Sequence, residues 1–143
     1  MKSIVFTVLI LCFSLHSAKA QSVFGKWHSI DSKTGKAEAI IEIYKEKNKA
    51  YAKVIDILNP DDKDKICVYC KGENKDQPIL GMIIVNGLKE KGDVWGSGKI
   101  LDPKNGNYYK CYITLVDNSK LKLRGYIGIS LFGRTEYWNK VEN

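Results

Sequence analysis

The residues that decide the fold are 107–129, with the sequence NYYKCYITLVDNSKLKLRGYIGI. Two runs of alternating side chains flank the turn-forming triplet Asp117-Asn118-Ser119. A period of two indicates strands with one buried face, and a short polar turn between two such strands indicates an antiparallel hairpin. The expected buried face consists of Tyr109, Cys111, Ile113, Leu115, Leu121, Leu123, Ile127 and Ile129.

The same pattern of alternating runs and turn signals extends over most of the chain. We predict eight strands, at residues 23–30, 37–45, 49–58, 80–88, 93–101, 107–116, 120–129 and 133–141. Residues 79–88 are apolar on both faces, so a short helix is an alternative there. Sequential long strands leave two exposed edges unless the sheet closes on itself. The expected fold is therefore all-β, an eight-stranded antiparallel up-and-down β-barrel.

Residues 1–20 have the features of a secretory signal peptide. Lys2 supplies the positive start, residues 4–15 are apolar, and Ala18-Lys19-Ala20 forms a cleavage site. Lipidation at Cys12 is a weaker alternative, because Leu11 is larger than the residue that normally precedes a lipidated cysteine. We predict cleavage after Ala20, a periplasmic or secreted protein, and one domain over residues 21–143. No later apolar run is long enough to span a membrane.

The charge of residues 21–143 comes mainly from lysine. This part of the chain has 19 lysines and two arginines against 16 acidic residues, a net charge of +5. The lysines are dispersed, whereas nucleic-acid-binding proteins concentrate basic residues on one face and favour arginine. The composition therefore favours a solvated surface and argues against nucleic-acid binding. The two arginines, Arg124 and Arg134, both lie in the last thirty residues.

One connection, residues 59–79, is much longer than the others and is polar. It contains Cys67-Val68-Tyr69-Cys70, which we predict to form a disulfide in an oxidising compartment. Redox catalysis at this pair is one alternative. Metal binding with Cys111 and His28 is another, although a second paired half-site is missing. Cys111 is expected on a barrel strand as a small apolar residue, with pairing to the other cysteines as a lesser option.

Two family resemblances follow from short motifs. Gly25-Lys26-Trp27 resembles the Gly-x-Trp signature of lipocalins, which implies that Trp27 closes one end of the barrel and that Arg134 packs over it. The chain also resembles a family of small secreted bacterial proteins of unknown function with a lipocalin-like barrel. The residues that carry this resemblance are 25–27, the Cys67-x-x-Cys70 motif, 98–103 with Gly106 and Tyr109, 124–128, and 133–135 with Trp138. It implies an exported barrel and no particular activity.

The last hairpin is the best candidate for a binding site. A three-residue loop, Leu131-Phe132-Gly133, would place Tyr126 opposite Trp138 and both arginines on one face. A two-residue loop would instead place Gly125 opposite Trp138 and move Arg124 to the other face. The candidate ligand-binding residues are Trp27, Tyr109, Arg124, Tyr126, Arg134 and Trp138.

These residues suggest a non-enzymatic barrel that binds a small, partly apolar or anionic ligand, without a cofactor. The same residues would alternatively form a plug at one end of the barrel. A second hypothesis is a cell-envelope interaction protein that uses residues 59–79 as its contact surface. The third is the redox or metal protein described above, based on Cys67 and Cys70.

Overall fold

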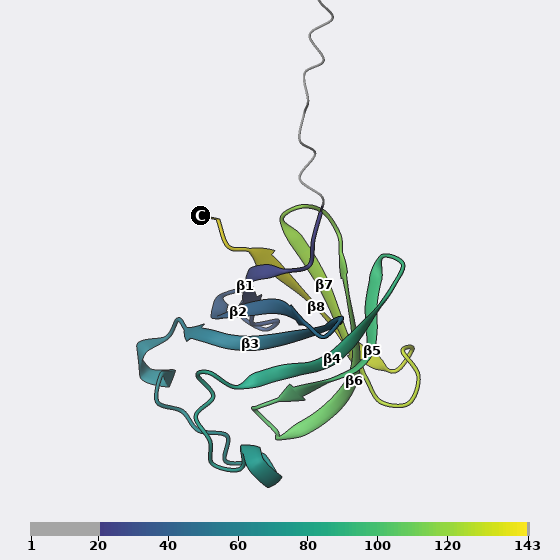
Figure 1. The fold of residues 1–143 in the computed structure, drawn as a ribbon. Helices are drawn as coiled ribbons and strands as arrows, with labels where there is room; N and C mark the ends of the chain where they lie inside the picture. Colours follow the sequence, from purple (N-terminus) through teal and green to yellow (C-terminus); the bar gives the residue numbers. More distant parts are fainter. Residues whose placement is uncertain (1–20, 143) are drawn as a thin grey trace, which may run out of the picture.

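The computed structural model describes residues 21–142, which form one closed barrel of eight strands (Figure 1). The strands are β1 (Gly25–Ile30), β2 (Ala37–Glu46), β3 (Lys49–Ile57), β4 (Ile83–Lys91), β5 (Val94–Asp102), β6 (Asn107–Leu115), β7 (Lys120–Tyr126) and β8 (Gly133–Lys140). The predicted fold is therefore confirmed. The predicted signal peptide lies outside the described residues.

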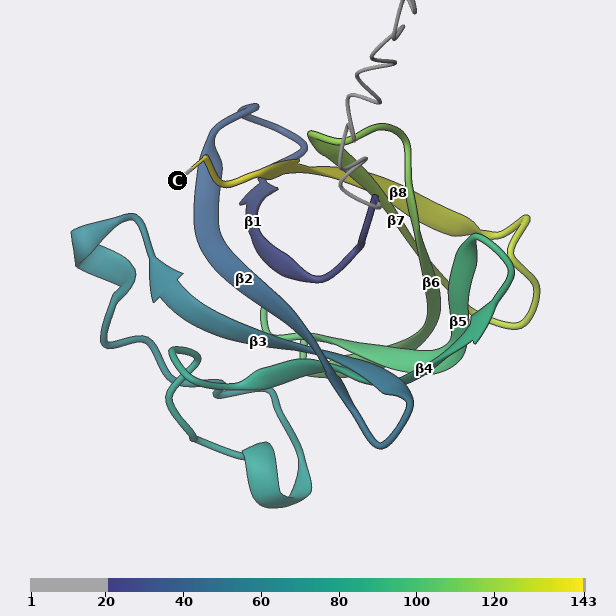
Figure 2. The ribbon, with the colours of Figure 1, turned by 45° about the horizontal axis from the view of Figure 1, so that its top comes forward.

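Each strand pairs antiparallel with the next one along the chain, and β1 pairs with β8 to close the ring (Figure 2). The closing contact is short, with Trp27 opposite Lys140 and His28 opposite Asn139. Residues 79–88 are not helical, because β4 begins at Ile83 and pairs with both β3 and β5. Among the described residues, no helix has the length and apolar character needed to cross a membrane.

The two ends of the barrel differ in their connections. At one end, which we call the base, the connections are the short turns 47–48, 92–93 and 116–119. At the other end, the mouth, the connections are 31–36, 58–82, 103–106 and 127–132. The mouth therefore carries the longer loops, and the base is closed by side chains.

Trp27 is the central side chain of the base and is fully buried. Its indole Nε1 donates a hydrogen bond to the Val23 carbonyl at 2.8 Å. The ammonium of Lys140 lies 4.3 Å from the Trp27 ring centroid and donates to the Phe24 carbonyl. Burial lowers the pKa of Lys140. The expectation that Arg134 packs over Trp27 is wrong, because Lys140 takes this place six residues further along β8.

Neither the three-residue loop nor the two-residue loop expected for the last hairpin is present, although Arg124 lies on the other face, as the two-residue alternative predicted. Tyr126 pairs with Gly133, Gly125 with Arg134, and Leu121 with Trp138, so residues 127–132 form a six-residue loop. Strand β7 ends before Ile127, and neither Ile127 nor Ile129 belongs to the buried face. Arg134 and Trp138 face inward. Arg124 pairs with Thr135 and lies on the outer face, so the two arginines do not share one face.

The long connection between β3 and β4 folds back against the barrel mouth. Cys67 and Cys70 form the predicted disulfide, and both are buried. This segment packs on the β5–β6 turn, where Gly106 has a φ of +73°. A Cβ at Gly106 would collide with the Tyr69 carbonyl and lie 2.7 Å from the Cys70 nitrogen. Only glycine permits this close approach of the two backbones.

Candidate functional site

A cavity of about 470 Å³ opens at the barrel mouth. Its lining is mostly apolar, with apolar contributions from six of the strands and from residue 79 of the long connection. The apolar lining residues include Ala39, Ile41, Val54, Ile57, Ile79, Ile84, Ile100, Leu101, Leu123 and Trp138. The volume is within the range of small-molecule sites, and such sites are mostly apolar with a few polar groups.

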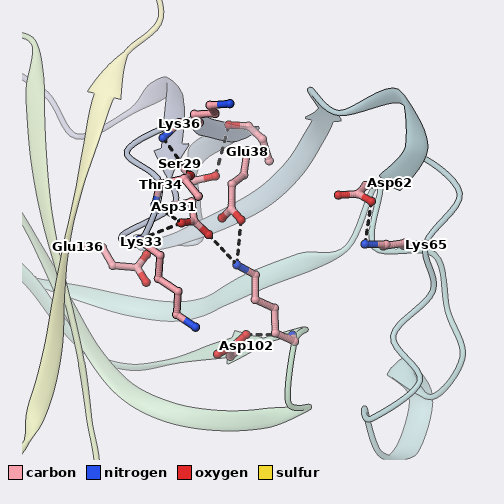
Figure 3. A network of polar contacts seen from close by, with 12 residues as sticks. Ser29, Asp31, Lys33, Thr34, Lys36, Glu38, Asp62, Lys65, Asp102 and Glu136 are labelled. Atoms are coloured by element: carbon pink, nitrogen blue, oxygen red, sulfur yellow. Dashed lines mark hydrogen bonds and ion pairs between the residues drawn. The ribbon is translucent and has the colours of Figure 1, made fainter.

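Charged side chains gather at the mouth of the cavity, and we call this group the ring. Figure 3 shows the part of it around Asp31 and Glu38, together with the Asp62–Lys65 pair. Lys104 Nζ lies 2.8 Å from Glu38 Oε1 and 3.6 Å from Asp31 Oδ2. The hydrogen bond from Lys104 to Glu38 raises the pKa of Lys104. Backbone N–H groups of Thr34 and Lys33 donate to Asp31 and hold its pKa well below the usual range. These contacts keep Lys104 and Asp31 ionised at neutral pH.

Arg134 belongs to a second part of the same ring. Its Nη2 lies 2.8 Å from Glu136 Oε1 and 3.9 Å from Asp102 Oδ2. On the third side, Lys65 pairs with Asp62 at 2.7 Å. Each of the three cationic groups of the ring therefore already faces a carboxylate, and the ring as a whole carries no excess positive charge.

The structure brings four of the six candidate ligand-binding residues to the cavity. Tyr109, Tyr126, Arg134 and Trp138 contribute to its lining. The Tyr109 hydroxyl accepts a hydrogen bond from Asn105 Nδ2 at 3.0 Å. Tyr126 reaches only the rim, because its ring packs beside Tyr112 with the centroids 6.5 Å apart.

The other two candidates do not line the cavity. Trp27 lies in the base of the barrel. Arg124 lies outside, where its Nε donates to the Ser130 carbonyl at 2.7 Å and its Nη2 to the Leu131 carbonyl at 3.2 Å. Arg124 therefore holds the β7–β8 loop rather than facing a ligand.

The acidic residues of the ring, among them Glu38, Asp102 and Glu136, were not predicted from the sequence. Glu136 has the same strand parity as Arg134 and Trp138, so the alternation of β8 was a usable signal for it. Asp102 is the last residue of β5 and Lys104 lies in the turn that follows it, and the closeness of this turn to Glu38 depends on the closed barrel. No local pattern indicates that contact.

The indole N–H of Trp138 is a buried polar group at the cavity. The Trp138 indole lines the cavity, and its Nε1 is buried without a hydrogen-bond partner in the part of the chain that the structure describes. Buried N–H groups are normally paired, and leaving one unpaired costs about 1–3 kcal/mol. A hydrogen-bond acceptor near this indole would remove that penalty.

Among the described residues, Cys111 is a free cysteine, and it is buried on the inner face of β6. Burial raises the pKa of the Cys111 thiol to about 12. Because the thiolate is the reactive form, we expect a thiol reagent at pH 8 to leave Cys111 unmodified in the native protein and to modify it after unfolding. Mass spectrometry of the labelled peptide measures this difference.

The control for this experiment is Asn118→Cys, which places a thiol in the exposed β6–β7 turn and should react at once. Labelling of Cys111 in the native protein as fast as residue 118 in this variant would contradict its burial.

Within residues 21–142, no three His, Cys, Asp or Glu side chains gather in a way that could hold a metal ion.

Comparisons with known proteins agree with this architecture. Among solved structures, the chain is similar to protein HP1028 from the human pathogen Helicobacter pylori, which is described as belonging to the lipocalin family. The TM-score is 0.75 at 16% identity, and the alignment covers 85% of this chain and 84% of the Helicobacter protein. This likeness supports the barrel fold.

The comparison with curated proteins gives no match. A family sequence profile, described as an uncharacterised protein conserved in bacteria, matches residues 25–140, which span all eight strands. The chain therefore belongs to this uncharacterised bacterial family, DUF2147, and has a lipocalin-like fold.

Proposed function

We propose that this protein is a non-enzymatic binding protein that holds one small, mostly apolar molecule inside its barrel. The observation that carries the proposal is the apolar cavity of about 470 Å³, open at the mouth. A lipocalin-like barrel of eight strands is wide enough for one small ligand. The proposal requires no cofactor and no catalytic step.

The lining suggests the chemistry of the ligand. Its apolar part would contact the aliphatic walls and the Trp138 ring, and a polar acceptor group would satisfy the Trp138 N–H. Arg134 and Lys104 are already paired with carboxylates, so the mouth favours a neutral polar group over a fully anionic one. We extend the proposal to an exported location, which the Cys67–Cys70 disulfide supports.

Filling the cavity should abolish binding without unfolding the barrel. Gly125 lies on the inner face, and a Cβ there would be 3.7 Å from Ile100 Cγ2 and 3.8 Å from Tyr109 Cβ, which are ordinary contacts. Gly125→Leu therefore places a side chain into the cavity. We expect the native protein to bind the neutral dye N-phenyl-1-naphthylamine and the variant to bind it at least about tenfold more weakly, measured by fluorescence titration.

Lys122→Leu is the matched control, because it adds the same side chain to the outer face of the same strand. It should leave dye affinity unchanged, and thermal melting should show both variants folded. Competition by dodecanol and by dodecanoate tests the charge preference, with the alcohol expected to displace the dye at lower concentration. Failure of the native protein to bind the dye, or equal binding by Gly125→Leu, would overturn the proposal.

A further inference from the structure

The β7–β8 loop exposes four large apolar side chains. Ile127 is 71% exposed, Ile129 60%, Leu131 75% and Phe132 70%. The other two residues of the loop are glycine and serine, so residues 127–132 contain no charged group. The loop projects sideways from the barrel, away from the long connection (Figures 1 and 2, yellow). Four large apolar side chains exposed within six residues are typical of an interaction site.

Hydrogen bonds hold this loop in a defined shape. The Arg124 guanidinium donates to the carbonyls of Ser130 and Leu131 from the loop and to the Thr135 hydroxyl from β8. The Phe132 N–H donates to the Ile129 carbonyl at 3.1 Å. Because the backbone carbonyls are turned toward Arg124, the apolar side chains remain directed into solvent instead of packing on the barrel.

Two lysines lie beside the loop on the outer face of the barrel. Lys110 pairs with Tyr126, the last residue before the loop, and Lys99 pairs with Lys110. Both lysines are exposed, and neither forms an ion pair within residues 21–142. The apolar loop 127–132 is thus flanked by two lysines that have no acidic partner in the described structure.

We propose that residues 127–132 insert into the interfacial region of a lipid bilayer that contains anionic lipids. The four apolar side chains would enter the boundary between headgroups and acyl chains, and Lys99 and Lys110 would contact the lipid phosphates. Ile127 and Phe132 also line the rim of the cavity. Insertion would therefore bring the mouth of the barrel to the membrane surface.

A bilayer fits this surface better than a second copy of the chain does. Residues 21–143 carry a net charge of +5, so two copies repel each other, whereas an anionic membrane attracts each of them. The loop is also convex and projecting, which suits insertion into a fluid surface. The inference does not depend on the proposed ligand, because Ile129 and Leu131 are not part of the cavity lining.

Sedimentation with lipid vesicles tests the inference. We expect the purified protein to bind vesicles of phosphatidylcholine and phosphatidylglycerol, and to bind pure phosphatidylcholine vesicles more weakly. Ile129→Asn with Leu131→Asn should reduce binding at least about tenfold, because two apolar side chains no longer enter the lipid. Lys99→Gln with Lys110→Gln should reduce binding about fivefold per lysine and make the remaining binding less sensitive to salt.

The controls alter matching residues at the base of the barrel. Val94→Asn with Val116→Asn replaces two exposed apolar residues there, and Lys89→Gln with Lys91→Gln removes two exposed charges. Both control variants should bind vesicles like the native protein, as should Gly125→Leu. Absence of vesicle binding by the native protein, or an equal loss in loop and control variants, would overturn the inference. So would a loop-dependent dimer in sedimentation velocity without vesicle binding.

Discussion

Replacing Trp27 by alanine is expected to destabilise the barrel by about 3–5 kcal/mol, the range for truncating a fully buried aromatic side chain. Trp27 is 0% exposed and fills the base where β1 closes against β8. The variant loses this packing, the hydrogen bond to the Val23 carbonyl and the contact with the Lys140 ammonium. A small domain has only about 5–15 kcal/mol of stability. The variant should therefore lose a large share of the stability of the domain.

Urea unfolding and thermal melting measure this effect. A loss of this size corresponds to a decrease in Tm of about 10–20 °C for a domain of this length. Lys140→Met removes the ammonium over Trp27 and keeps the Trp27 ring in place. It should lower the free energy of unfolding by about 0.5–2 kcal/mol, the contribution of a cation over an aromatic ring. Tyr137→Ala is the control, since Tyr137 is an exposed aromatic residue on the same strand as Lys140. A Trp27→Ala variant as stable as Tyr137→Ala would contradict this role.

Strand number and order could be predicted because local patterns carry them. The alternation before and after Asp117-Asn118-Ser119 corresponds to β6 and β7, whose inward residues Cys111 and Leu121 are almost fully buried. Short turns leave little choice about which strands are neighbours. Local patterning together with short connections was therefore sufficient for the eight-stranded barrel.

The register of the last hairpin could not be predicted from the same patterns. Apolar residues continue with a period of two through Ile127 and Ile129, beyond the point where β7 ends. The Arg124 guanidinium binds the Ser130 carbonyl, six residues further along the chain, and this hydrogen bond holds the backbone after β7 as a loop. The exposed apolar surface of this loop therefore resembled a buried strand in the sequence.

Two further features depend on the closed barrel and not on local sequence. They are the identity of the cation over Trp27 and the presence of a cavity. Arg134 was expected over Trp27 because lipocalins place an arginine there, but β8 positions Lys140 at that level. Space inside the barrel depends on the sizes of side chains that meet from distant strands. Ala39 and Gly125 are small inward-facing residues that contribute to this space, and no local pattern distinguishes them from ordinary small residues.

Gly106→Ala is expected to displace the disulfide-containing segment from the barrel mouth. The new Cβ would collide with the Tyr69 carbonyl, and both sides of this contact are backbone. Neither side can move away by changing a side-chain rotamer. The substitution also strains a backbone with a φ of +73°, which costs roughly 1–2 kcal/mol by itself. We expect a total loss of about 2–4 kcal/mol, together with exposure of the buried Cys67–Cys70 disulfide.

Gly92→Ala separates backbone strain from the collision at Gly106. Gly92 has a similar φ of +61°, and a Cβ there would meet nothing within 4 Å. This variant should lose only the strain energy and keep the disulfide protected. In the native protein, dithiothreitol should reduce Cys67–Cys70 slowly because both cysteines are buried, and Gly106→Ala should speed the reduction at least about tenfold. If both variants show equal stability and equal reduction rates, the segment is not held by close backbone packing at Gly106.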